Sequence, residues 1–235
     1  MSSSRLKVFL QGSCRIHRPF RALQTSGKVD FLNSVDPCWF SHTARAARQS
    51  IEIICGRVAP PFHMRELFFE TDDARKIEFL APDRLALADL LVIEVCTLSS
   101  VDVDGWDVNA HRMYSAVKNG DPRADGASKR INTSADIAHE IGVIKEITGK
   151  NVMIVNHIGV TGLKAVDDAR SSLTRTLEAA RQIEAFFLFD TSNALRNVPT
   201  ELALEDHNHY RREFEAVMGE AMLNFMAQLP ISSRA

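Results

Sequence analysis

Five short apolar runs recur along the chain, and a longer polar stretch follows each of them. The runs are rich in β-branched and aromatic residues and show no strict alternation of apolar and polar positions. This pattern is typical of strands that are covered on both faces of a parallel sheet. We therefore predict buried strands at residues 6–11 (LKVFLQ), 51–55 (IEIIC), 90–95 (LLVIEV), 151–158 (NVMIVNHI) and 185–190 (AFFLFD).

The segments between these runs predict helices. Residues 134–148 place isoleucines at three- and four-residue steps, and Gly149 follows as a stop signal. Residues 166–183 and 210–229 have the same spacing. Strands that alternate with helices predict an α/β fold with right-handed crossovers, here a three-layer αβα sandwich around a five-stranded parallel sheet of flavodoxin-like type.

One long segment interrupts the alternation. Residues 99–133 are rich in Gly, Asp, Asn and Ser and are longer than a simple connection. Such an insertion is either a mobile substrate lid or a surface excursion, and Trp106 and Tyr114 favour the lid. The length of 235 residues suits one hydrophobic core, so we expect a single domain over residues 1–235.

Composition narrows the classes of function. The net charge of −2 comes without a clustered basic face, which argues against nucleic acid as a partner. No segment approaches the roughly 18 apolar residues of a membrane span, and the apolar run near the N-terminus is too short for a secretory signal. We expect a cytoplasmic protein, and the sequence indicates no oligomeric state.

The four cysteines, Cys14, Cys38, Cys55 and Cys96, are scattered without C-x-x-C pairing. This spacing predicts neither a zinc site nor a disulfide framework, and the histidines show no metal-ligand spacing either. We interpret the cysteines as reduced thiols, most of them buried.

Cys14 differs from the others because it follows the first predicted strand directly, after Gly12 and Ser13. In open α/β sheets, ligands bind outside the carboxyl ends of the strands. A thiol at the start of the next helix sits in a positive local potential, which lowers its pKa and favours the thiolate. Cys14 is thus a candidate nucleophile, and the alternative is a small buried residue at a strand–helix junction.

A second candidate group follows the last predicted strand. Asp206 and His209 are three residues apart, ahead of the terminal helix. This spacing lets the carboxylate approach the imidazole and fix its tautomer, which leaves the other ring nitrogen free to act as a base. Alternatively, His207 and His209 cap a helix on a polar surface.

Together, Gly12-Ser13-Cys14 and Asp206-x-x-His209 resemble the first and last blocks of the SGNH (GDSL-like) hydrolase superfamily, with Cys14 in place of the nucleophilic serine. The Gly-x-Cys form is similar to a group of bacterial capsular-polysaccharide acetyltransferase-like proteins that bind coenzyme A. The resemblance implies an SGNH-like fold and acyl transfer by Cys14, His209 and Asp206. It also implies a coenzyme A thioester as a possible donor, with no covalently bound cofactor.

The chain departs from this family after the third predicted strand. The expected Gly-x-Asn-Asp block is replaced by VIEVCTLSS, residues 92–100. A hydroxyl of Thr97, Ser99 or Ser100 is then the candidate oxyanion donor beside the backbone N–H of Cys14. The glycine of the family's second block is assigned to Gly56.

Two histidines complete the predicted substrate-binding set. His42 lies before a segment with Arg45 and Arg48, which either binds an anion at a helix N-terminus or forms an N-cap with a solvated basic face. His157 lies at the end of the fourth predicted strand, where it lines the pocket, replaces a triad member or forms a hydrogen-bonded rim.

These residues predict an acetyltransferase or esterase that forms a thioester on Cys14 and acts on a carbohydrate or another small hydroxylated molecule. Two alternatives stay open. One is an SGNH esterase with Ser13 as the nucleophile, and the other is a binding or structural protein that kept the fold without catalysis.

Overall fold

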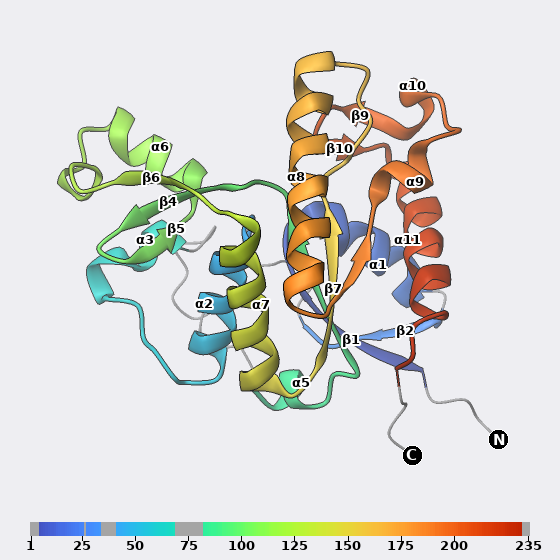
Figure 1. Cartoon of the computed structure of the whole chain (residues 1–235), viewed down its shortest axis with the longest axis horizontal. Coiled ribbons are helices and arrows are strands. Elements are labelled where there is room, and N and C mark those ends of the chain that lie inside the picture. The colour runs from blue at the N-terminus through green and yellow to red at the C-terminus, as the bar shows by residue number, and fades with distance from the viewer. Residues whose placement is uncertain (1–4, 26, 34–40, 69–81, 232–235) are drawn as a thin grey trace.

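The computed structural model describes residues 5–25, 27–33, 41–68 and 82–231. Its centre is a five-stranded sheet in which all neighbouring strands are parallel, in the order β2-β1-β3-β7-β8 (Figure 1). The strands are β1 (Leu6–Gln11), β2 (Val29–Phe31), β3 (Leu90–Val95), β7 (Asn151–Asn156) and β8 (Phe187–Phe189). Counted among themselves, their order is 2-1-3-4-5, which is the flavodoxin-like arrangement. The predicted α/β fold is confirmed.

Helices cover both faces of this sheet (Figure 1). One face packs against α2 (Ala44–Ile54), α7 (Ser134–Thr148) and α8 (Lys164–Ile183), and the other packs against α1 (Cys14–Thr25) and α11 (Arg212–Met226). Successive side chains of a strand point to opposite faces. Phe9 of β1 accordingly joins the core beneath α2, whereas Val8 and Leu10 join the core beneath α1.

Shorter elements connect the layers. They are the 3-10 helix η1 (Phe62–Met64), the helices α3 (Arg65–Phe68), α5 (Pro82–Ala86), α9 (Thr191–Leu195) and α10 (Thr200–Ala203), and the strands β9 (Leu204–Asp206) and β10 (His209–Tyr210). Strands β9 and β10 form a small antiparallel pair just before α11. Within the described part of the chain, no helix combines the length and the apolar character needed to cross a bilayer.

The predicted strand at 51–55 is wrong, because IEIIC is the end of helix α2. The apolar residues Ala44, Ala47, Ile51 and Ile54 lie at helical steps, and all four are buried against the sheet. This period becomes visible only when IEIIC is read together with the arginine-rich segment before it. The second strand of the sheet is instead the three-residue β2, and Gly56 follows a helix rather than a strand, which removes its assignment to the family's second block.

The insertion after β3 has its own structure. It forms a three-stranded antiparallel sheet of β4 (Ser99–Val103), β5 (Trp106–Val108) and β6 (Ser128–Ile131), together with α6 (Ala110–Lys118) and the short η2 (Pro122–Ala124). The sequence pattern predicted no strands here. These strands span only three to five residues, and β6 is exposed along its whole length, so an apolar run does not mark it.

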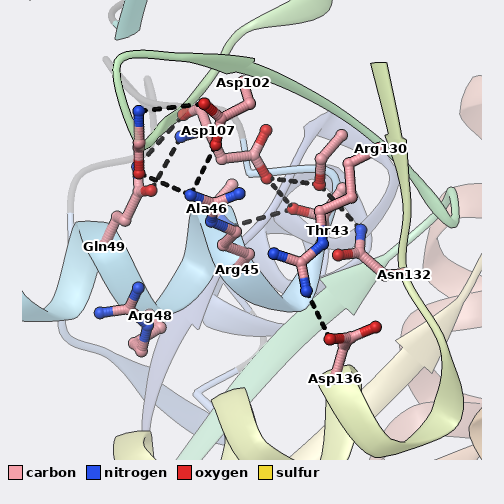
Figure 2. A network of polar contacts seen from close by, with 12 residues as sticks. Thr43, Arg45, Ala46, Arg48, Gln49, Asp102, Asp107, Arg130, Asn132 and Asp136 are labelled. Atoms are coloured by element: carbon pink, nitrogen blue, oxygen red, sulfur yellow. Dashed lines mark hydrogen bonds and ion pairs between the residues drawn. The ribbon is translucent and has the colours of Figure 1, made fainter. Parts of the chain in front are cut away.

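A buried polar network joins this small sheet to helix α2 (Figure 2). Asp107 accepts hydrogen bonds from Thr43 Oγ1 at 2.5 Å and from Ser100 Oγ at 2.9 Å. The backbone N–H of Asp107 donates to Gln49 Oε1 at 2.8 Å, and Arg45 forms an ion pair with Asp102 at 2.7 Å. Because these groups are largely withdrawn from water, their pairing fixes how the small sheet sits on α2.

The same network decides between the two interpretations of the segment with Arg45 and Arg48, which forms the first part of α2. Thr43 is the N-cap of the helix and accepts a hydrogen bond from Ala46 N at 3.0 Å, as one of the two predicted alternatives requires. The expected solvated basic face is wrong. Arg45 is buried against Asp102, and Arg48 pairs with Glu52 and Glu140.

Candidate active site

The candidate site lies at the carboxyl ends of the parallel strands. The strand order reverses between β1 and β3, and doubly wound sheets bind ligands at such a switch point. Strands β1, β3 and β7 are in register at Gln11, Ile93 and Ile154. Three positions further along each segment, the chain carries Cys14, Cys96 and His157.

The turn after β1 is shaped by close contact with Glu94 of β3. The backbone N–H of Ser13 donates to Glu94 Oε2 at 2.6 Å. A Cβ atom at Gly12 would lie 2.6 Å from Glu94 Cβ, so only glycine fits against this strand. The turn leads directly into α1, whose first residue is Cys14, and Cys14 is partly exposed.

Glu94 is fully buried and is held by a charge from α1. Arg15 Nε donates to Glu94 Oε1 in an ion pair. Burial favours the neutral acid, but the charge of Arg15 and the hydrogen bonds from Ser13 outweigh it and lower the pKa of Glu94 to about 2. The residues on both sides of Cys14 are therefore fixed to the ionised carboxylate of β3.

Asp206 and His209 meet across the β9–β10 hairpin. Nδ1 of His209 lies 3.0 Å from Asp206 Oδ1 and 2.9 Å from Oδ2. The two residues are direct partners in the antiparallel register, so the strand pair β9–β10 brings them together. The bond from His209 lowers the pKa of Asp206, which keeps this carboxylate ionised at neutral pH.

The hairpin lies within electrostatic reach of the Cys14 turn. Tyr210, which follows His209, is buried, and burial is the main cause that raises the pKa of its phenol. Glu94 also raises this pKa, while Arg15 opposes the shift. The described residues show no hydrogen bond between Cys14 and His209, so their catalytic pairing stays a prediction.

His42, Thr97 and Ser99 line a small pocket that opens to solvent. The carbonyl of His42 accepts hydrogen bonds from the backbone N–H groups of Cys96 and Thr97 at 3.0 and 3.3 Å. The hydroxyl of Thr97 accepts from Ser99 N at 3.0 Å. Other residues around the pocket are Thr43, Asp107 and Asn109, whereas Cys14, Asp206 and His209 do not line it.

His157 lies on the same edge, directly after β7. Its side chain is buried, and Nε2 lies 3.2 Å from Nη2 of Arg170. Burial is the main cause that lowers the pKa of this imidazole, and the charges of Arg15 and Arg170 lower it further.

The other cysteines have separate environments. Burial raises the pKa of Cys55, and it raises the pKa of Cys96 to about 12. Cys14, Cys55 and Cys96 are free thiols, and each residue is partly exposed. The expectation that most of the cysteines are buried is therefore wrong for the three that the structure describes. Cys38 lies outside the described residues.

Two site residues escaped the sequence analysis. Glu94 is the one carboxylate within the apolar strand LLVIEV, and Arg170 is a buried cation on the inner side of α8. A charged residue inside an apolar pattern requires a partner, since burying an unpaired charge is costly. A charged residue inside an apolar pattern is visible in the sequence at both Glu94 and Arg170.

Comparison with known proteins gives one family and several distant structures. A search of curated proteins finds no match to the chain. Among solved structures, a putative SGNH hydrolase from Slackia heliotrinireducens is 11% identical with a TM-score of 0.47, and the match covers 95% of this chain and 100% of that one.

Two further structures are similar at the same level. The salicylyl-acyltransferase SsfX3 from a tetracycline biosynthetic pathway is 14% identical with a TM-score of 0.45, over 98% of this chain and 58% of that one. A mutant of Axe2, an acetyl-xylooligosaccharide esterase from Geobacillus stearmophilus, is 9% identical with a TM-score of 0.46. The match covers 99% of this chain and 98% of that one. At these values the likeness carries no conclusion about activity.

The family comparison is more extensive. The model of the TviD N-terminal domain matches residues 6–127 and 121–225, which together span the parallel sheet, the insertion, the Cys14 turn and the β9–β10 hairpin. The chain therefore belongs to the TviD N-terminal domain family.

Proposed function

We propose that this chain is an acyl-transfer enzyme with Cys14 as its nucleophile, His209 as its base and Asp206 as the group that orients the base. The observation that carries the proposal is the contact of both Asp206 oxygens with Nδ1 of His209. This contact places a proton on Nδ1 and leaves Nε2 as the basic nitrogen. The described residues offer Nε2 no other hydrogen-bond partner.

The proposed reaction has two stages. The Cys14 sulfur, after His209 takes its proton, attacks the acyl carbon, and a carbon–sulfur bond forms while the bond to the leaving group breaks. The imidazolium returns the proton to the leaving group. An acceptor hydroxyl then loses its proton to His209 and attacks the acyl-Cys14 thioester, which releases the Cys14 thiol.

The proposed substrates are an activated acyl donor, such as a coenzyme A thioester, and a saccharide or another small hydroxylated acceptor. The pocket beside His42, Thr97 and Ser99 supports this assignment, since its hydroxyl and imidazole groups suit a hydroxylated molecule. Transfer to water instead of a saccharide would make the same site an esterase.

Ser13 is the less suitable nucleophile. Its side chain is buried, its backbone N–H donates to Glu94 Oε2, and its hydroxyl accepts a hydrogen bond from the backbone N–H of Arg15 at 3.4 Å. Cys14 is partly exposed and is the first residue of α1. An acyl group therefore has better access to the sulfur of Cys14 than to the hydroxyl of Ser13.

The test is intact mass spectrometry after brief incubation with acetyl-coenzyme A or with p-nitrophenyl acetate. We expect an acetyl adduct on the wild-type protein, on Ser13→Ala and on the control Cys55→Ala, and none on Cys14→Ala. If no adduct forms on the wild type, or if the adduct persists in Cys14→Ala, the cysteine mechanism fails. An acetyl adduct that persists in Cys14→Ala but is lost in Ser13→Ala would identify Ser13 as the nucleophile.

A further inference from the structure

The hydrogen bonds of His157 leave one of its ring nitrogens without a partner. Nε2 lies 3.2 Å from Nη2 of Arg170. Nδ1 is buried and has no hydrogen-bond partner within the described residues. The side chain cannot swing away easily, because the residue is only 8% exposed.

The contact with Arg170 fixes the tautomer of this imidazole. A guanidinium only donates hydrogen bonds, so Nε2 must accept and therefore carries no proton. Burial and the charges of Arg15 and Arg170 lower the pKa of His157 to about 3, with a smaller effect of His42 in the same direction and an opposing one of Glu94. The ring is therefore neutral at physiological pH, and its single proton is on Nδ1.

A buried N–H donor without an acceptor costs the folded chain about 1–3 kcal/mol. Such groups are rare in folded proteins, and this one belongs to a residue at the carboxyl edge of the sheet, where the neighbouring segments carry Cys14 and Cys96. An acceptor supplied by a bound substrate would remove the cost. The chemistry of the site indicates a substrate oxygen in that place.

We propose that His157 donates its Nδ1–H to the carbonyl oxygen of the acyl group under attack by Cys14, and that Arg170 is the positioning residue which fixes this donor. The inference rests on the proposed function. As the carbon–sulfur bond forms, the carbonyl π electrons move to the oxygen, and the N–H stabilises the resulting anion without giving up its proton. The carbonyl re-forms when the leaving group departs.

This assignment fills the place of the family asparagine that VIEVCTLSS lacks. Arg170 also donates to Asn208 Oδ1 at 3.0 Å and to the carbonyl of Ile158 at 2.8 Å. Asn208 lies between Asp206 and His209 in the hairpin. One guanidinium therefore positions the proposed oxyanion donor and also contacts the hairpin that carries the base.

The test compares the rate of Cys14 acetylation by p-nitrophenyl acetate in single-turnover mass spectrometry. We expect His157→Ala to lower the limiting rate about 10²- to 10³-fold with a small change in the half-saturating ester concentration. His157→Asn, whose amide places an N–H near the position of Nδ1, should recover part of the loss. His139→Ala changes an exposed histidine on α7 and should react at the wild-type rate.

A second readout observes the tautomer without any substrate. Two-bond ¹H–¹⁵N spectra of histidine-labelled protein should show His157 neutral, with its proton on Nδ1, from pH 5 to pH 8. In Arg170→Met the ring should lose this fixed tautomer and titrate closer to the ordinary pKa. Protonation of His157 on Nε2 in the wild type, or its titration in that pH range, would overturn the proposal.

The outcomes also separate this inference from the function on which it rests. A wild-type protein that forms no Cys14 adduct overturns the proposed function, and the oxyanion role of His157 falls with it. An adduct that forms equally fast in wild type and His157→Ala overturns the role of His157 alone. Thermal unfolding of each variant distinguishes a loss of rate from a loss of folded protein.

Discussion

Gly12 lies directly against Glu94, and a Cβ atom at position 12 would come within 2.6 Å of the Cβ atom of Glu94 and 2.7 Å of Cδ1 of Ile16. A larger residue must displace β3 or the start of α1. We expect Gly12→Ala to lower the free energy of unfolding by about 1–3 kcal/mol and to slow acetylation of Cys14. Urea unfolding measures the first effect. Gly126→Ala, where nothing lies within 4 Å, is the control and should change stability by less than about 0.5 kcal/mol.

The Arg15–Glu94 pair predicts a specific acid sensitivity. Folding lowers the pKa of Glu94 from an ordinary value of 4.5 to about 2, so its ionised form stabilises the fold above pH 4.5. This contribution is lost as the pH falls from about 4.5 toward 2. Glu94→Gln leaves Arg15 buried without a carboxylate, and we expect a loss of about 3–5 kcal/mol at pH 7.

Urea unfolding at several pH values checks this prediction. The stability difference between wild type and Glu94→Gln should shrink as the pH falls below 4.5. Glu178→Gln, which removes an exposed pair with Arg181, should cost less than about 1 kcal/mol at every pH. A constant difference between wild type and Glu94→Gln down to pH 2 would contradict the assignment.

The exposed Asp206–His209 pair predicts an effect on rate without an effect on stability. His209→Ala should lower acyl transfer about 10²- to 10⁴-fold, because the general base is lost. Asp206→Asn should give a smaller loss, since the imidazole remains but its tautomer is no longer fixed. Both variants should unfold at the wild-type temperature, because both side chains are largely exposed. Equal rates in wild type and His209→Ala would exclude this histidine as the base.

The cysteines should differ in their reaction with dilute iodoacetamide at pH 7. Burial raises the pKa of Cys55 and Cys96, which leaves little thiolate on either sulfur. We expect alkylation of Cys14 to precede that of both, as measured by peptide mass spectrometry over time. Faster alkylation of Cys96 than of Cys14 would contradict this order of reactivity.

The network around Asp107 predicts different results for two substitutions. Asp107→Ala leaves the hydroxyls of Thr43 and Ser100 without their acceptor and should destabilise the fold by about 1–3 kcal/mol for each buried group. Asp107→Asn retains an acceptor oxygen and should cost less, because burial already raises the pKa of Asp107 and disfavours its charge. Thermal unfolding measures both, with the exposed Asp125→Ala as control.

Local sequence pattern predicted the parts of the fold whose burial follows a simple period. Strand β3 and helix α7 have the predicted bounds, and Gly149 ends α7 with a positive φ of 63°. IEIIC failed because a run of five apolar residues fits a buried strand as well as one side of a helix. The N-cap at Thr43, eight residues earlier, and the helical spacing of Ala44 and Ala47 with Ile51 distinguish the two.

The site was predictable only in part, for a different reason. The contact of Asp206 with His209 spans three residues, so spacing alone anticipated it. The bonds of Glu94 to Ser13 and of Arg170 to His157 connect residues that are 81 and 13 positions apart. Their partners depend on strand order and on helix packing, which the pattern of one segment does not contain.

Packing of α11 on the face of the sheet beneath α1 has a consequence for synthesis of the chain. The core on this face joins Val8 and Leu10 of β1 to Met218 and Met222 of α11, across most of the sequence. At roughly 5–20 residues per second, a ribosome needs on the order of ten to forty seconds to extend the chain from β1 to the end of α11. During that interval the apolar face of β1 lacks the cover of α11, so this half of the core is completed only after nearly all of the described residues have been synthesised.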